Sequence, residues 1–95
     1  MRRAAKVDAN HGSIRSAARL VGGWVDLFQL KNCCDGLFVF NGKVVAIEVK
    51  DPEKPPSAKK QTEGEKAFQD HWESHGGRYE IIETEEQIFD LAKDL

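Results

Sequence analysis

Apolar side chains recur along the chain with two different periods. Between residues 8 and 21 they are spaced by three and four positions, the one-sided pattern of an amphipathic helix that Asp8 can cap and Gly22 can end. Two more helices are predicted after Thr62 and Thr84, because each threonine precedes a Glu or Gln by three positions, as in a capping box. Apolar runs of strand type cover residues 24–30, 37–40, 44–49 and 79–82.

These patterns predict the element order αβββαβα and therefore an α/β fold. The second helix ends near Ser74, before two glycines, and the third extends to Leu95. Three prolines make residues 51–57 a loop. A chain of 95 residues is the size of one small domain, so residues 1–95 are expected to form a single domain.

The dipeptide Asn41–Gly42 lies between two apolar runs and predicts a two-residue hairpin, because a type I′ turn needs positive φ at both central positions. Such a turn pairs Phe40 with Lys43, and continuing the register outward places Asp35 directly opposite Glu48 on one face. The other face of the hairpin is apolar throughout, with Phe38, Phe40, Val45, Ile47 and Val49. The face that carries the acids is also apolar near the turn, with Val39, Val44 and Ala46. Both faces are therefore expected to be covered near the turn.

Two directly opposed carboxylates repel each other and need a compensating cation. Lys50, two residues beyond Glu48 on the same face, could supply the charge in a purely structural cluster. A divalent cation could supply it instead, since carboxylate oxygens suit Mg²⁺ or Mn²⁺. In that second interpretation the metal binds a scissile phosphate and lowers the pKa of a bound water. Lys50 then orients the water or stabilises charge in the transition state.

Charge and cysteine content add little until their positions are considered. The net charge of −2 disfavours a nucleic-acid partner, yet residues 1–20 carry +4 and residues 67–95 carry −6. No apolar run is long enough to cross a membrane. Adjacent Cys33 and Cys34 cannot build a disulfide framework, so a reducing, cytoplasmic location is expected.

Several short segments resemble one nuclease family in their order and spacing. Asp35 followed by Glu48-Val49-Lys50 across a hairpin resembles the signature of the PD-(D/E)xK nuclease superfamily. Further segments narrow the resemblance to the stand-alone VRR-NUC (virus-type replication-repair nuclease) domain of phages and bacteria. They are Arg3 to His11, Asp35-Gly36, Ile47 to Asp51, Lys54 to Ser57 and Thr62 to Phe68.

The resemblance implies a restriction-endonuclease-like core with a mixed sheet flanked by helices. It also implies a cofactor, Mg²⁺ or Mn²⁺, and hydrolysis of phosphodiester bonds in branched or structured DNA. Small members of the family are associated with homodimers that resolve four-way (Holliday) junctions in DNA repair, in a bacterial or phage-infected cell. By the same resemblance Asp35 and Glu48 are metal ligands, the carbonyl of Val49 is a further ligand, and Lys50 is the catalytic lysine.

The chain departs from the family at two positions. Cys34 precedes the motif acid where proline is usual, which affects only the backbone. His11 stands on the first helix where the family often has Glu, and it would ligate Mn²⁺ better than Mg²⁺. Asp8 or Asn10 could act from the same turn instead, and a histidine at a helix start with no role in binding is the alternative.

Basic residues near the proline loop are candidates for gripping DNA phosphates. These are Lys54, Lys59, Lys60 and, on the first helix, Arg15. Linker lysines without function are the alternative. Polar residues on or near the second helix, Gln61, Glu65 and Gln69, either contact the site or form a solvated face.

Three functions therefore stay open at this stage. The leading one is a metal-dependent, structure-selective endonuclease that acts on four-way junctions as a homodimer. A flap, nicking or restriction-type endonuclease is the alternative among enzymes. A DNA-binding accessory protein without catalysis is the alternative outside enzymes, and metal-dependent cleavage separates it from the first two.

Overall fold

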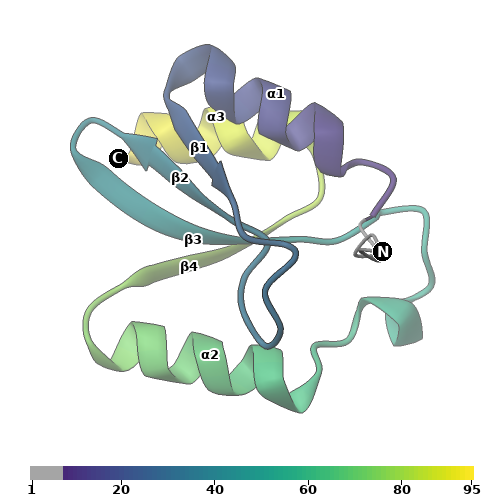
Figure 1. Ribbon diagram of the computed structural model, residues 1–95. Helices are drawn as coiled ribbons and strands as arrows, with labels where there is room; N and C mark the ends of the chain where they lie inside the picture. The colour runs from purple at the N-terminus through teal and green to yellow at the C-terminus, as the bar shows by residue number, and fades with distance from the viewer. Residues whose placement is uncertain (1–7) are drawn as a thin grey trace, which may run out of the picture.

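The computed structural model describes residues 8–95, so Arg2, Arg3 and Lys6 of the basic N-terminal segment lie outside the described residues. The predicted order of helices and strands is confirmed, with one added 3₁₀ turn, η1, in the proline loop (Figure 1). The elements are α1 (His11–Val21), β1 (Gly23–Asp26), β2 (Gly36–Phe40), β3 (Lys43–Val49), η1 (Pro56–Lys59), α2 (Glu63–Ser74), β4 (Arg78–Ile82) and α3 (Glu85–Asp94).

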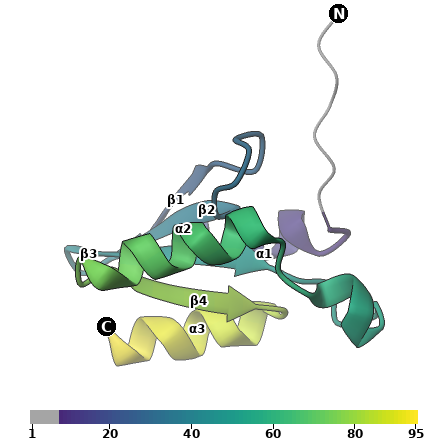
Figure 2. The ribbon, with the colours of Figure 1, turned by 90° about the horizontal axis from the view of Figure 1, so that it is seen from below.

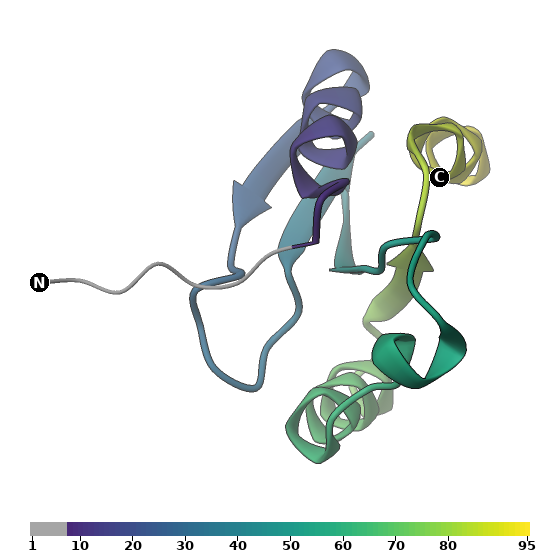
Figure 3. The ribbon, with the colours of Figure 1, turned by 90° about the vertical axis from the view of Figure 1, so that its right-hand side faces the viewer.

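The four strands form one mixed sheet in the order β1-β2-β3-β4. The first three strands are antiparallel neighbours, whereas β4 pairs with β3 in parallel after the α2 crossover. Helices α1 and α3 lie on one face of the sheet and α2 lies on the other (Figures 1 and 3). The expected α/β architecture with a mixed sheet between helices is therefore present.

The hairpin between β2 and β3 has the predicted register. Phe40 pairs with Lys43, and the regular pairing continues to Gly36 opposite Ile47. The turn residues Asn41 and Gly42 have φ values of 54° and 75°, as the two central positions of a type I′ turn require.

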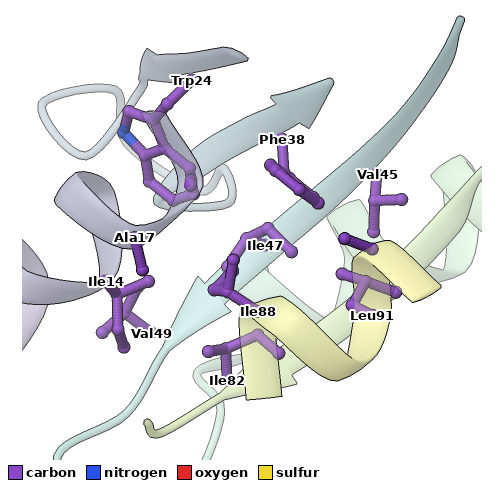
Figure 4. Packing of buried hydrophobic residues seen from close by; sticks show 12 residues of the cluster. Ile14, Ala17, Trp24, Phe38, Val45, Ile47, Val49, Ile82, Ile88 and Leu91 are labelled. Carbon is purple, nitrogen blue, oxygen red and sulfur yellow. The ribbon is translucent and has the colours of Figure 1, made fainter. Parts of the chain in front are cut away.

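The main core lies between the sheet and the pair α1 and α3 (Figure 4). The apolar hairpin face predicted from the sequence contributes its buried side chains to this core, where they meet Ile14 of α1 and Ile88 of α3. A smaller cluster on the other face packs Ala46 and Tyr79 against Phe68 and Trp72 of α2. Both faces of β3 are thus covered along most of its length, which fixes the strand rigidly.

Three local expectations are wrong. Val39 and Val44 are 36% and 44% exposed, because neither belongs to the cluster that packs against α2. The first strand ends at Asp26, since the chain then turns instead of continuing to residue 30. Helix α1 begins at His11 after Asn10, and the Asp8 side chain does not cap it but pairs with Lys54.

Gly36 opens β2 at a point where there is no space for a side chain. A Cβ atom at this position would lie 2.2 Å from the indole ring of Trp24 on β1. The close packing of Trp24 against β2 therefore requires glycine directly after Asp35. No helix in the described part of the chain is long and apolar enough to cross a membrane.

Candidate active site

Polar side chains gather at the end of the sheet where β3 stops. The N-termini of α1 and α2 and the loop containing η1 lie at this same end (Figures 1 and 3). Glu48 is the penultimate residue of β3, Lys50 follows the strand, and Asp35 directly precedes β2. The hairpin therefore brings together the acid, the second acid and the lysine that the sequence motif predicts.

Asp35 does not lie directly opposite Glu48 as the register predicts. Its amide donates to the carbonyl of Ile47 at 2.9 Å, so the strand leaves the regular pairing one residue early. Its carboxylate instead reaches the end of β3, where Oδ2 accepts a hydrogen bond of 2.7 Å from the Val49 amide. Burial raises the pKa of Asp35 above its ordinary value, although the Val49 hydrogen bond and the charge of His11 oppose that rise.

Glu48 is a carboxylate held inside the protein, with only 1% of its surface exposed. Its Oε1 accepts hydrogen bonds from Gln61 Nε2, at 2.8 Å, and from the Tyr79 hydroxyl. Its Oε2 lies 2.9 Å from Lys50 Nζ in an ion pair, and it has no other partner among the described residues. Oε1 is thus held by two hydrogen bonds, whereas the only neighbour of Oε2 among the described residues is a cation, the Lys50 ammonium.

Burial alone would lower the pKa of Lys50, but the neighbouring carboxylates raise it. The largest opposing effect is the contact with Glu48, and Glu65 of α2 adds to it at 3.8 Å. Burial and the Glu48 carboxylate both raise the pKa of Tyr79, so the phenol keeps its proton and donates. Lys50 therefore keeps its proton at neutral pH, as an ammonium ion beside Glu48.

A second polar cluster, which the sequence analysis missed, centres on Asp26 at the end of β1. Its Oδ1 accepts from Trp24 Nε1 at 2.7 Å and lies 3.0 Å from His11 Nε2, while Arg15 binds Oδ2 at 2.9 Å. Burial would raise the pKa of Asp26, but these hydrogen bonds and the charge of Arg15 lower it to about 2. No sequence signal marks Asp26, because only the packing of α1 on β1 creates the cluster.

This cluster defines the setting of His11, which is 3% exposed. Asp26 occupies its Nε2, which leaves Nδ1 as the nitrogen through which the histidine could serve as a ligand. Within residues 8–95 no group of three or more His, Cys, Asp or Glu side chains is close enough to hold one metal ion. The role of His11 as a metal ligand accordingly stays a prediction.

The two alternatives to His11 have structural partners. Asp8 pairs with Lys54. Asn10 donates through Nδ2 to the carbonyls of Lys50, at 2.9 Å, and Glu83, at 2.7 Å, while its Oδ1 is buried without a partner among the described residues. Asn10 thereby fastens the start of α1 to the main chain of Lys50.

The donor set of Asp35 and Glu48 fits a hard divalent cation. Each carboxylate uses one oxygen for a protein donor, Oδ2 for Val49 and Oε1 for Gln61 and Tyr79. The second oxygen of Asp35 makes no hydrogen bond to another described residue, and the second oxygen of Glu48 pairs only with Lys50 Nζ. Mg²⁺ takes one or two protein carboxylates and completes its shell with water and phosphate, so a third side-chain ligand is not required.

The residues predicted to grip DNA are mostly engaged in ion pairs. Lys54 binds Asp8 at 2.8 Å, Lys59 binds Glu83 at 2.9 Å, and Arg15 binds Asp26. Lys60 is exposed and makes no ion pair with any residue in 8–95. Lys54, Lys59 and Arg15 would have to leave these carboxylates before they could contact a phosphate, whereas Lys60 would not.

Comparison of the chain with protein-family models, with curated proteins and with solved structures finds no match.

Proposed function

We propose that this protein is a divalent-metal-dependent DNA endonuclease with a restriction-endonuclease-like core of the VRR-NUC type. The observation that carries the proposal is the meeting of the buried Glu48 and the half-buried Asp35 with the Lys50 ammonium at the end of β3. Withdrawing two acids and one base from water in this way adds little stability, since desolvation offsets the attraction. Such a cluster is typical of a functional site.

In this proposal Asp35 holds the cation through Oδ1 and Glu48 holds it through Oε2, the oxygen that also faces Lys50, with the carbonyl of Val49 as a further ligand. The bound metal would supply a water of lowered pKa and would neutralise charge on the scissile phosphate. The protein's own contribution is orientation: Gln61 and Tyr79 fix the Glu48 carboxylate, and the Val49 amide fixes Asp35. Lys50 is positioned to orient the attacking water or to stabilise the phosphate oxygens in the transition state.

The proposed substrate is branched DNA, with four-way junctions first. The basic residues Lys54, Lys59 and Lys60 lie in the loop that leaves the catalytic strand, so they border the site. A domain of 95 residues offers little further surface for a large substrate, which supports action as a homodimer. Two sites related by a two-fold axis would suit paired nicks in a symmetric junction.

Cleavage of an end-labelled four-way junction tests the proposal. Cutting is expected with Mg²⁺ or Mn²⁺ and not with EDTA. The variant Lys50→Ala should cut about 10²–10³-fold more slowly, the usual loss when one transition-state donor is removed. Glu86→Gln, a neutralised acid on the exposed surface of α3, is the matched control and should cut normally.

Two outcomes would reject this function. Equal cleavage by wild type and Glu48→Gln, after repurification, would show that the activity belongs to a contaminant. Metal-independent binding of DNA without any cleavage would favour the accessory protein instead. A panel of flaps, nicked duplexes and linear duplexes decides between junction cleavage and the alternative endonuclease specificities.

A further inference from the structure

Two histidines lie side by side at the C-terminal end of α2. His71 and His75 are both exposed, are four residues apart, and have ring centroids 4.7 Å apart. Together with Trp72 and Gly77 they line a surface hollow. At 1.5 Å per residue His71 and His75 stand about 9 and 15 Å from Glu65 along the axis of α2, so they lie toward the other end of this helix from the Lys50 cluster. Figure 2 shows α2 along its length.

Hydrogen bonds settle which nitrogen of His75 carries the proton. Its Nδ1 lies 3.0 Å from the carbonyl of His71 and 3.1 Å from the Ser74 hydroxyl. The Ser74 hydroxyl donates its own hydrogen to the His71 carbonyl, at 2.7 Å, so toward the ring it can only accept. Nδ1 therefore faces two acceptors and must be the protonated nitrogen. In the neutral ring the lone pair is then on Nε2.

A histidine held in this way is prepared for a metal. Ligating histidines donate their other ring N–H to a backbone carbonyl or a carboxylate, which fixes the tautomer and the ring orientation. Histidines at i and i+4 share one face of a helix and can bind the same ion. Imidazole suits Zn²⁺, Cu²⁺ and Ni²⁺, whereas Mg²⁺ and Ca²⁺ prefer oxygen.

We propose that His71 and His75 form a binding site for one transition-metal ion, separate from the site at the end of β3. The two imidazoles supply two ligands and water completes the shell, because no third His, Cys, Asp or Glu in residues 8–95 joins them. The site selects Ni²⁺, Cu²⁺ and Zn²⁺ over Mg²⁺ and exchanges its ion freely with solvent. This inference does not rest on the proposed nuclease function.

Titration calorimetry with NiCl₂ on the full, untagged chain tests the site. The titration is made in excess Mg²⁺, so that the proposed site at the end of β3 is occupied, and wild type should then still bind about one Ni²⁺ per chain at the histidines. Loss of a residue that only hydrogen-bonds to a metal ligand already costs about 10–100-fold in metal affinity, so loss of a ligand in His71→Gln or His75→Gln should weaken binding at least about tenfold. Both side chains are exposed, so these variants should keep the wild-type circular dichroism spectrum.

Glu48→Gln is the control for the other site and should bind Ni²⁺ as wild type does. Trp72 lines the same hollow, so its fluorescence should fall as Ni²⁺ binds and recover with EDTA. Unchanged affinity in both histidine variants, or no binding by wild type, would overturn the proposal. Binding lost in Glu48→Gln but kept in the histidine variants would overturn it as well, by assigning the ion to the end of β3.

Discussion

The Glu48 carboxylate is stabilised by donors from outside its own strand. Tyr79→Phe removes the hydroxyl that donates to Glu48 Oε1 but keeps the ring against Phe68. A hydrogen bond to a charged group contributes about 1.5–3 kcal/mol, so the free energy of unfolding should fall by about that amount. Urea denaturation followed by circular dichroism measures the change.

The same substitution made in a Glu48→Gln background is the control. With the charge of the acceptor removed, the cost of Tyr79→Phe should drop, and the difference between the two costs is the interaction free energy of the pair. Equal costs in both backgrounds would mean that the hydroxyl does not act through the carboxylate.

Asp26 gives the protein a defined sensitivity to acid. Its pKa is about 2 in the fold and 3.8 ordinarily, so the folded state binds its proton less readily than the unfolded state. The resulting stability is present above about pH 4 and is lost as pH falls toward 2. Such a shift is worth at most roughly 2 kcal/mol; for a side chain that is 23% exposed, solvent screening reduces it to about 1 kcal/mol.

Asp26→Asn should therefore cost about 1 kcal/mol at pH 7 and progressively less as the pH falls from about 4 through 2. Unfolding curves of both proteins at several pH values between 2 and 7 measure this difference. Asp35 also affects how the free energy of unfolding depends on pH, in the opposite direction, because its pKa is raised. Its contribution is the same in wild type and in Asp26→Asn, so it cancels in the difference between the two proteins. A constant difference across the whole range would contradict the assignment to the Asp26 charge.

Residues that act through local geometry were predictable, and those that act through packing were not. Asn41–Gly42 determined the hairpin register, and the meeting of Glu48 and Lys50 followed from the two-residue repeat of a single strand. Asp35 left that register because its side chain binds the Val49 amide. The contacts of Asp26 and Tyr79 join segments 11–31 residues apart, and no periodicity reports such distances.

At the scale of elements, two helices begin with complete capping boxes. Thr84 accepts from the Gln87 amide while the Gln87 side chain accepts from the Thr84 amide, and Thr62 and Glu65 do the same for α2. Thr84→Ala should lower the free energy of unfolding by about 1 kcal/mol. Urea denaturation measures the loss, and Thr84→Ser, which keeps the hydroxyl, is the control and should restore most of it.

Element types followed from the sequence more closely than element ends did. Both capping boxes were correct, because a cap is a contact between residues three positions apart. The first helix was expected to begin near Asp8, but the Asp8 carboxylate forms an ion pair with Lys54, 46 residues away, and does not cap the helix. The first strand was expected to reach residue 30, although β2 continues its pairing with β1 only as far as Asp26.

At the scale of the whole molecule, the paired acids make stability depend on the proposed cation. A ligand that binds only the folded state at 100 times its Kd adds about 2.7 kcal/mol, and 1 kcal/mol raises Tm by about 4–8 °C in a domain of this size. Saturating Mg²⁺ should thus raise Tm by roughly 10 °C or more. Differential scanning calorimetry with Mg²⁺ and with EDTA measures the shift.

Asp35→Asn is the control for that experiment, because it keeps an acceptor for the Val49 amide but loses the ligand charge. Its Tm should be almost independent of Mg²⁺. An equal Mg²⁺ response in wild type and Asp35→Asn would place the stabilising ion elsewhere on the molecule.

The position of β3 between β2 and β4 has a consequence for how the protein opens. A strand with neighbours on both sides and cores on both faces exchanges its amide hydrogens only when the whole domain unfolds. The segment around η1 has no such neighbours and its side chains are mostly exposed, so it can open alone. Glu48 and Val49 therefore belong to the slowest-exchanging part of the molecule, while the lysines ten residues later belong to one of the fastest. Mutations in the loop can thus change its surface without loosening the strand that carries Glu48.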